Sequence, residues 1–175
     1  MIIWINGTFG VGKTTAARGL QQRIKGSHLF DPELTGQLLR QQLPRETQTD
    51  DFQDEPLWRQ LNLMLLEQVD QPSAVIIVPM TLTNPDYFDE IISALQNKGH
   101  QVKHVTLMAS PTTIRRRLRS RFERAQSWGG RQAAERLRAL AHPVFSHHVD
   151  TDDLSKQQIV DVIGLLCDIP LSPPV

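Results

Sequence analysis

The stretch Met1–Thr15, MIIWINGTFGVGKTT, decides the fold. Its first residues form an apolar, β-branched run typical of a buried strand, and Gly7–Thr14 reads G-x-x-x-x-G-K-[ST]. A strand, this glycine-rich loop and a following helix are the context that a P-loop requires. The backbone N–H groups of such a loop and the helix N-terminus behind it form a cradle for phosphate. We therefore expect the chain to bind a nucleoside triphosphate here.

Two side chains of the loop carry the expected chemistry. Lys13 would reach the β- and γ-phosphates, and the hydroxyl of Thr14 would bind Mg²⁺. The alternative is a glycine-rich turn that matches the motif by chance. The full set expected at the nucleotide is Gly7, Thr8, Phe9, Gly10, Val11, Gly12, Lys13, Thr14 and Thr15, together with Arg117.

The length and composition of the chain exclude several classes of function. The chain has 175 residues, enough for one domain spanning 1–175, and 39% of them are hydrophobic. Its 19 basic and 19 acidic residues leave no overall basic field, so we expect neither nucleic acid nor an anionic membrane as partner. No apolar segment approaches the about 20 residues that cross a bilayer. The single cysteine, Cys167, fits a reducing compartment, so we expect a soluble, cytoplasmic protein.

Strand and helix patterns alternate along the chain, which predicts a three-layer α/β P-loop domain: a five-stranded parallel sheet with helices on both faces. The expected strands are 2–5, 27–30, 74–78, 102–108 and about 147–150. The expected helices are 13–24, 33–42, 57–69, 84–97, 112–124, 132–141 and 155–168. Right-handed crossovers place the ligand at the carboxyl ends of the strands.

The helix expected over 57–69 shows a clear apolar period. Leu57, Leu61, Met64, Leu65 and Val69 recur at helical spacing. This spacing predicts that they form the face that packs against the core.

Asp31 follows the second strand and is the first candidate for catalysis. A carboxylate at this edge lies across the pocket from the P-loop, where it could accept a proton from a substrate hydroxyl or hold a Mg²⁺-bound water. The alternative is an N-cap for the helix that begins at Pro32. The two roles are compatible.

Arginines supply the second group of candidates. The arginine-rich helix near 112–124 and the glycines after it predict a short lid over about 115–135. Arg117 and Arg121 share a helix face, and a lid arginine can stabilise a transferring phosphoryl group. The alternatives are a solvated basic face or a small nucleic-acid patch. Arg40, in a T-G-x-x-L-R pattern similar to that of adenylate-kinase-like enzymes, could hold a polar or anionic substrate group, or lie on the surface.

Two missing sequence motifs exclude further classes of nucleotide-binding protein. The strand over 74–78 ends at Pro79 without an acid, so the usual carboxylate partner of a motor ATPase is missing. Asn97-Lys98-Gly99-His100 lacks the final Asp of a guanine-reading N-K-x-D. These features argue against an AAA-type motor and a GTPase switch.

Several motifs together resemble the tunicamycin-resistance proteins over about residues 1–170. They are WINGTFGVGKT at 4–14, FDPE at 30–33, DDFQ-x-x-PLWR at 50–59, VPMT at 78–81 and TLMAS at 106–110. The resemblance implies ATP binding, resistance to a nucleoside antibiotic, and a fold similar to nucleoside monophosphate kinases and chloramphenicol phosphotransferase. It also implies that Lys13 and Thr14 bind nucleotide and metal and that Asp31 activates the acceptor.

The acceptor side is expected near two aromatic residues of the DDFQ-x-x-PLWR segment. Phe52 and Trp58 could stack on the base of a nucleoside, and Met80 follows the neighbouring strand. Core packing is the alternative for each aromatic residue.

Three functions remain open on the sequence. The first is transfer of the ATP γ-phosphate to a hydroxyl of tunicamycin or a related nucleoside, with Lys13, Asp31, Arg117 and Arg121 as catalytic residues. The second is an ATP-binding protein that sequesters the antibiotic without chemistry. The third is a kinase acting on nucleic acid or on another metabolite. The sequence leaves the oligomeric state open, a homodimer included.

Overall fold

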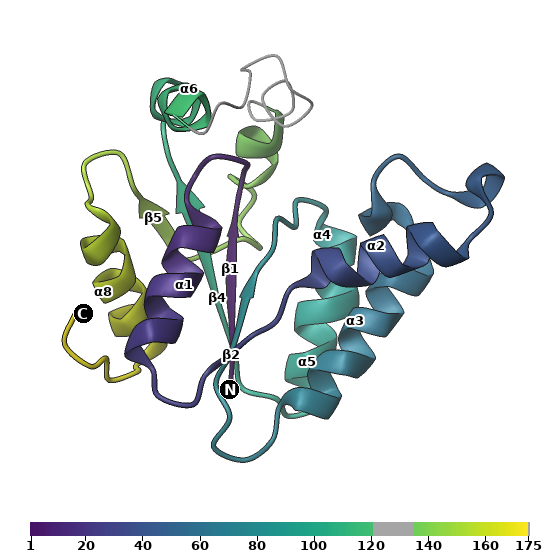
Figure 1. Cartoon of the computed structure of the whole chain (residues 1–175), viewed down its shortest axis with the longest axis horizontal. Coiled ribbons are helices and arrows are strands. Elements are labelled where there is room, and N and C mark those ends of the chain that lie inside the picture. Colours follow the sequence, from purple (N-terminus) through teal and green to yellow (C-terminus); the bar gives the residue numbers. More distant parts are fainter. Residues whose placement is uncertain (121–134, 175) are drawn as a thin grey trace.

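A five-stranded parallel sheet forms the centre of the computed structural model, which describes residues 1–120 and 135–174 (Figure 1). The strand order is β2-β3-β1-β4-β5, and every neighbouring pair is parallel. The strands are β1 (Ile2–Gly7), β2 (His28–Leu29), β3 (Ile76–Pro79), β4 (Val102–Met108) and β5 (His148–Asp150). The predicted fold class is confirmed.

Helices cover both faces of the sheet, as predicted. Ile3 and Ile5 face α1 (Lys13–Arg23) and α8 (Lys156–Cys167), whereas Ile2 and Trp4 face the opposite helices. The opposite layer contains α2 (Pro32–Gln42), α3 (Pro56–Val69), and a continuous helix made of α4 (Pro85–Phe88), a π-helical turn η3 (Asp89–Ser93) and α5 (Ala94–Asn97). Because β1 is buried on both faces, its residues form a continuous apolar run and do not alternate with polar ones.

The segment between α2 and α3, expected as a loop, contains two short 3₁₀ helices, η1 (Arg45–Thr47) and η2 (Phe52–Asp54). The arginine-rich helix is described over α6 (Pro111–Ser120), and residues 135–139 are helical. The predicted lid residue Arg121 lies outside the described residues, as does most of the segment predicted as lid.

The prediction for the core face of α3 was wrong for three of its five residues, since only Leu61 and Val69 of that set pack against the core. The side chains of Leu57, Met64 and Leu65 are 41%, 63% and 43% exposed, and the buried residues of this helix are Trp58, Arg59, Asn62 and Leu66. The buried polar groups have partners that set the rotation of the helix. Trp58 Nε1 donates to the Pro32 carbonyl at 2.9 Å, Thr35 pairs with Asn62 at 3.0 Å, and Arg59 binds Glu90 at 2.6 Å.

Within the described residues, no helix has both the length and the apolar character needed to cross a membrane. The carboxyl ends of β1, β3 and β4 meet at one edge of the sheet, and this edge carries the P-loop. The candidate site is built there.

Candidate functional site

The P-loop, residues 7–14, has the backbone that its glycines predict. Gly7 has φ +139°, and a Cβ at this position would lie 2.7 Å from the Leu107 carbonyl oxygen, so only glycine fits between β1 and β4. Gly12 has φ +114° and is the N-cap of α1. The loop therefore turns directly into the helix N-terminus.

Several features of this loop fit a bound triphosphate. No side chain caps α1, and its first turn has no acidic residue, so its N–H groups and positive dipole end favour an anion. Lys13 Nζ donates to the Thr8 carbonyl at 3.2 Å, which holds the ammonium over the loop. The Thr8 hydroxyl is buried and has no hydrogen-bond partner within the described residues.

The exposed hydroxyl of Thr14 in the first turn of α1 suits a Mg²⁺ ion that keeps most of its water ligands. The residues that the structure describes contain no cluster of three or more His, Cys, Asp or Glu side chains that could cage a metal by themselves. These residues therefore fit a metal held jointly by Thr14 and nucleotide phosphates.

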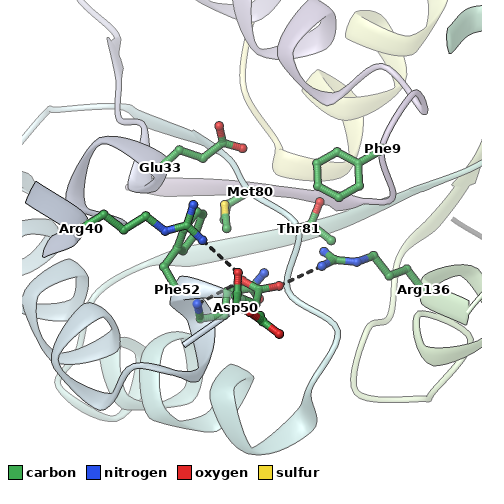
Figure 2. A pocket seen from close by; sticks show the side chains of 10 residues that line it. Phe9, Glu33, Arg40, Asp50, Phe52, Met80, Thr81 and Arg136 are labelled. Carbon is green, nitrogen blue, oxygen red and sulfur yellow. Dashed lines mark hydrogen bonds and ion pairs between the residues drawn. The ribbon is translucent and has the colours of Figure 1, made fainter. Parts of the chain in front are cut away.

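Two pockets flank the P-loop. The first, of about 300 Å³, lies toward α8 and is called the nucleotide-side pocket; it is lined by Val11, Gly12, Thr15, Ala16, Arg117, Leu154, Lys156 and Ile159. The second, of about 370 Å³, lies toward α2 and is called the acceptor pocket (Figure 2). Its lining residues are Phe9, Glu33, Arg40, Asp50, Asp51, Phe52, Gln53, Met80, Thr81 and Arg136.

Arg117 belongs to the nucleotide-side pocket. Its guanidinium donates to the Val11 carbonyl at 2.8 Å and to Thr151 at both Oγ1 (2.9 Å) and the carbonyl oxygen (2.7 Å). These bonds join α6, the P-loop and the segment after β5. Arg117 is therefore part of the wall beside the loop, on the side away from the acceptor pocket.

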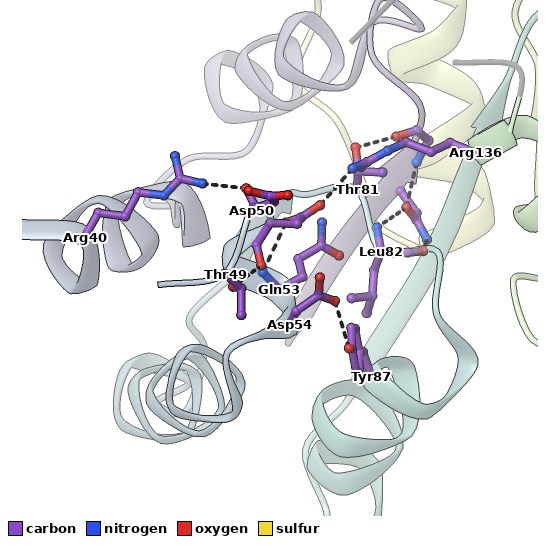
Figure 3. Close-up of polar contacts among 12 residues, drawn as sticks. Arg40, Thr49, Asp50, Gln53, Asp54, Thr81, Leu82, Tyr87 and Arg136 are labelled. Carbon is purple, nitrogen blue, oxygen red and sulfur yellow. Dashed lines mark hydrogen bonds and ion pairs between the residues drawn. The ribbon is translucent and has the colours of Figure 1, made fainter. Parts of the chain in front are cut away.

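The acceptor pocket has an arginine at each end (Figure 3). Arg40 donates to the Asp50 carbonyl at 2.9 Å and lies over the Phe52 ring, with its guanidinium carbon 5.6 Å from the ring centroid. Arg136 pairs with Asp51 at 2.8 Å. Both arginines therefore contact the acidic segment 50–51, which forms one wall of the pocket.

The two predicted acceptor-side aromatics have different positions. Phe52 lines the pocket, and its ring packs so closely on α2 that a Cβ at Gly36 would lie 2.6 Å from it. Trp58 is completely buried and does not line the pocket, because its indole is fixed between the Pro32 carbonyl and the Phe52 ring 5.4 Å away. The interpretation of Trp58 as a ligand contact is corrected to core packing. Met80 is 3% exposed and lines the pocket.

Asp31 is an N-cap, as its alternative interpretation predicted. Its Oδ1 accepts from the Glu33 N–H at 3.0 Å, and the carboxylate is exposed. Glu33, two residues further along the chain, lines the acceptor pocket. Burial and the nearby charge of Asp31 raise the pKa of Glu33, and the positive charge of Lys13 partly offsets this shift. Of these two carboxylates, Glu33 therefore lies within electrostatic reach of Lys13 in the P-loop.

Sequence reasoning missed several pocket residues. Glu33 was visible beside Asp31, but the capping pattern drew attention to Asp31 alone. Phe9 was expected at the nucleotide, whereas its ring lines the acceptor pocket, with the Arg136 guanidinium carbon 5.0 Å from its centroid. Thr81 lies in the VPMT motif at 78–81 but was not named as a site residue. Arg136 had no signal of its own, because only the fold brings it to the P-loop.

Comparisons with known proteins agree with this geometry. The family model described as "AAA domain" matches residues 2–144. The tunicamycin resistance protein of Deinococcus radiodurans is 32% identical, with a TM-score of 0.83 over 99% of each chain. The chain belongs to the AAA-domain family and to the tunicamycin-resistance protein family.

Other similar structures show how widely the fold of this tunicamycin-resistance family occurs. A gluconokinase from Sinorhizobium meliloti 1021 is 17% identical with a TM-score of 0.66, over 95% of this chain and 90% of its own. A shikimate kinase from Bacteroides thetaiotaomicron is 19% identical with a TM-score of 0.59, over 96% and 97%. At such low sequence identities, the similarity to these two kinases shows only a shared fold. A search of curated proteins gave no match.

The chain belongs to the AAA-domain family by its sequence and its fold. β3 ends at Pro79, and the next residues, Met80 and Thr81, are not acidic, so the carboxylate that a motor ATPase carries directly after this strand is missing.

Proposed function

We propose that this chain is an ATP-dependent phosphotransferase that moves the γ-phosphoryl group to a hydroxyl of a nucleoside-type small molecule. One observation carries the proposal: a single P-loop separates two pockets, and Glu33, which lines the acceptor pocket two residues after Asp31, lies within electrostatic reach of Lys13. A protein that only binds nucleotide has no need of the second pocket.

The donor half is assigned to the nucleotide-side pocket and the loop. The base and ribose would lie against the wall that contains Arg117, and the phosphates would bind the N–H groups of α1 and Lys13. Mg²⁺·ATP, held in part by Thr14, would supply the phosphoryl group with its charge partly neutralised.

The acceptor half is assigned to the pocket near α2. Asp31 would take the proton of the acceptor hydroxyl through the carboxylate oxygen that does not cap α2. Phe52 offers a flat apolar surface for a base or sugar ring, and Arg40 and Met80 border the same space.

Charge that develops on the transferring group would be stabilised by cations on the acceptor side of the P-loop. Lys13 lies in the loop, and Arg136 lies over Phe9 at the entrance of the acceptor pocket. We assign the same role to Arg121, which follows α6 in the chain.

The substrate is proposed from the family. Because the Deinococcus relative is a tunicamycin resistance protein, we propose tunicamycin or a similar nucleoside antibiotic as the acceptor and resistance as the outcome. We also propose a cytoplasmic location, because the single cysteine, Cys167, is a free thiol and forms no disulfide within the chain.

Mass spectrometry of tunicamycin after incubation with ATP, Mg²⁺ and the protein tests the proposal. We expect a mass gain of one phosphoryl group, which should be lost in Lys13→Ala and reduced at least about 100-fold in Asp31→Asn. Lys25→Ala changes an exposed lysine in the turn after α1 and is the matched control. Saturated binding of both ligands without any mass gain would contradict phosphotransfer and support sequestration.

A further inference from the structure

The side chains of Asn6 and Thr81 hold both backbone groups of Gly7, the first residue of the P-loop. The Gly7 N–H donates to Asn6 Oδ1 at 2.8 Å, and Thr81 Oγ1 donates to the Gly7 carbonyl at 2.7 Å. Asn6 is completely buried and Thr81 is 3% exposed. These hydrogen bonds are therefore shielded from water, and breaking one would leave a buried group without a partner.

The same segment, residues 80–82, is attached to β1 at further points. Asn6 Oδ1 also accepts from the Leu82 N–H at 2.9 Å, and Asn6 Nδ2 donates to the Leu82 carbonyl at 2.7 Å. Trp4 Nε1 donates to the Met80 carbonyl at 3.2 Å. These hydrogen bonds attach segment 80–82 to the end of β1.

Thr81 and Met80 also line the acceptor pocket (Figure 2), and Figure 3 draws Thr81 among the polar contacts of this region. One side chain, Thr81, therefore borders the acceptor space and binds the first glycine of the phosphate loop. In the place where many nucleotide-binding proteins carry an acid after β3, this chain has a neutral hydroxyl bonded to the loop.

We propose that Thr81 is a positioning residue that couples the acceptor pocket to the P-loop, so that acceptor and nucleotide bind with positive cooperativity. An acceptor that packs against Met80 and Thr81 would restrain segment 80–82, and the Thr81–Gly7 bond would pass this restraint to the loop. Because the first ligand to bind already orders the segment and the loop, the second ligand loses less conformational entropy when it binds. The inference rests on the proposed two-pocket function.

Isothermal titration calorimetry tests the coupling. A non-hydrolysable ATP analogue is titrated into the Mg²⁺-containing protein, with and without saturating tunicamycin. We expect tunicamycin to tighten binding of the analogue by at least about 5-fold in the natural chain, a typical lower value for coupled sites. Thr81→Val, which keeps the shape but removes the hydroxyl, should reduce this factor to nearly one.

Two variants separate coupling from a general structural effect. Thr81→Ser restores the hydroxyl and should restore the coupling. Thr83→Val makes the same change two residues further on, outside the residues that line the pocket, and should leave the coupling unchanged. If Thr81→Val fails to fold by circular dichroism, Thr81→Ala is measured with the same expectation.

Equal coupling factors in Thr81→Val and the natural chain would overturn the inference, as would independent binding of the two ligands to the natural chain. Failure of the proposed function looks different, because the natural chain would then bind no ATP analogue or give no phosphorylated tunicamycin under the conditions described above.

Discussion

At the scale of single residues, the site depends on where neighbouring side chains point. Asp31 and Glu33 are two positions apart, yet one caps α2 and the other lines the acceptor pocket. The sequence supports the choice of Asp31 because a carboxylate before Pro32 is recognisable as a cap. Glu33 could not be selected in the same way, since its approach to the pocket depends on the rotation of α2 relative to the P-loop.

Glu33 should impose a pH dependence on stability. Its pKa is raised in the folded protein, first by burial and then by Asp31, so the folded state binds the proton more tightly than the unfolded state. Stability from this group is therefore present below the unfolded pKa and is lost as pH rises through the folded pKa. Glu33→Gln should raise the melting temperature at pH 7 relative to the natural chain, but not at pH 4. A melting temperature at pH 7 that is unchanged or lower in Glu33→Gln would contradict this.

His104 should make the stability of the protein depend on pH in the opposite direction. It lies 8% exposed between Phe88 and Phe145, and its pKa is lowered to about 4, first by burial and then by the charges of His147 and His148. Between pH 6.5 and about 4 the unfolded state binds the proton and the folded state does not, so stability falls as pH falls through this window.

Chemical denaturation at a series of pH values measures the effect of His104. The lowered pKa of His104 corresponds to about 3 kcal/mol of folding stability, which should be lost as the pH falls from 6.5 to 4. His104→Gln, whose amide oxygen can still accept from Asn6 Nδ2, should show a much flatter profile. An equally steep profile in that variant would assign the acid sensitivity to another group.

At the scale of elements, apolar patterns predicted where helices and strands lie better than which way they face. The apolar run at the start of β1 correctly predicted a buried strand. The apolar period of α3 predicted the core face only in part, and three of its five residues are exposed. Arg59 and Asn62 are buried instead, through specific polar partners that periodicity does not report. Expectations for 121–134 lie outside the described residues.

The orientation of α3 can be tested by two substitutions. Met64→Gln changes an exposed side chain and should alter the unfolding free energy by less than about 0.5 kcal/mol, whereas a core methionine would cost several times more. Trp58→Phe removes the buried indole N–H that binds the Pro32 carbonyl and should cost about 1–3 kcal/mol. Urea denaturation of both variants gives these values, and the reverse order of costs would restore the face predicted by periodicity.

At the scale of the whole molecule, the sheet places two pockets on either side of one phosphate loop. The order β2-β3-β1-β4-β5 brings the ends of β2 and β3 to the acceptor side and the segment after β5 to the nucleotide side. The P-loop and the fold class could be predicted from local sequence. The pairing of Phe9 with Arg136 and of Thr81 with Gly7 could not, since these contacts join residues that are far apart in the chain.

The most direct test of the proposed function is a crystal structure of the chain with a non-hydrolysable ATP analogue, Mg²⁺ and tunicamycin bound together. We predict the nucleotide base beside Arg117 and the nucleoside part of tunicamycin against Phe52. An acceptor hydroxyl should lie about 3 Å from the Asp31 carboxylate and in line with the γ-phosphate. Tunicamycin bound outside the acceptor pocket, or with no hydroxyl directed at the γ-phosphate, would contradict the account.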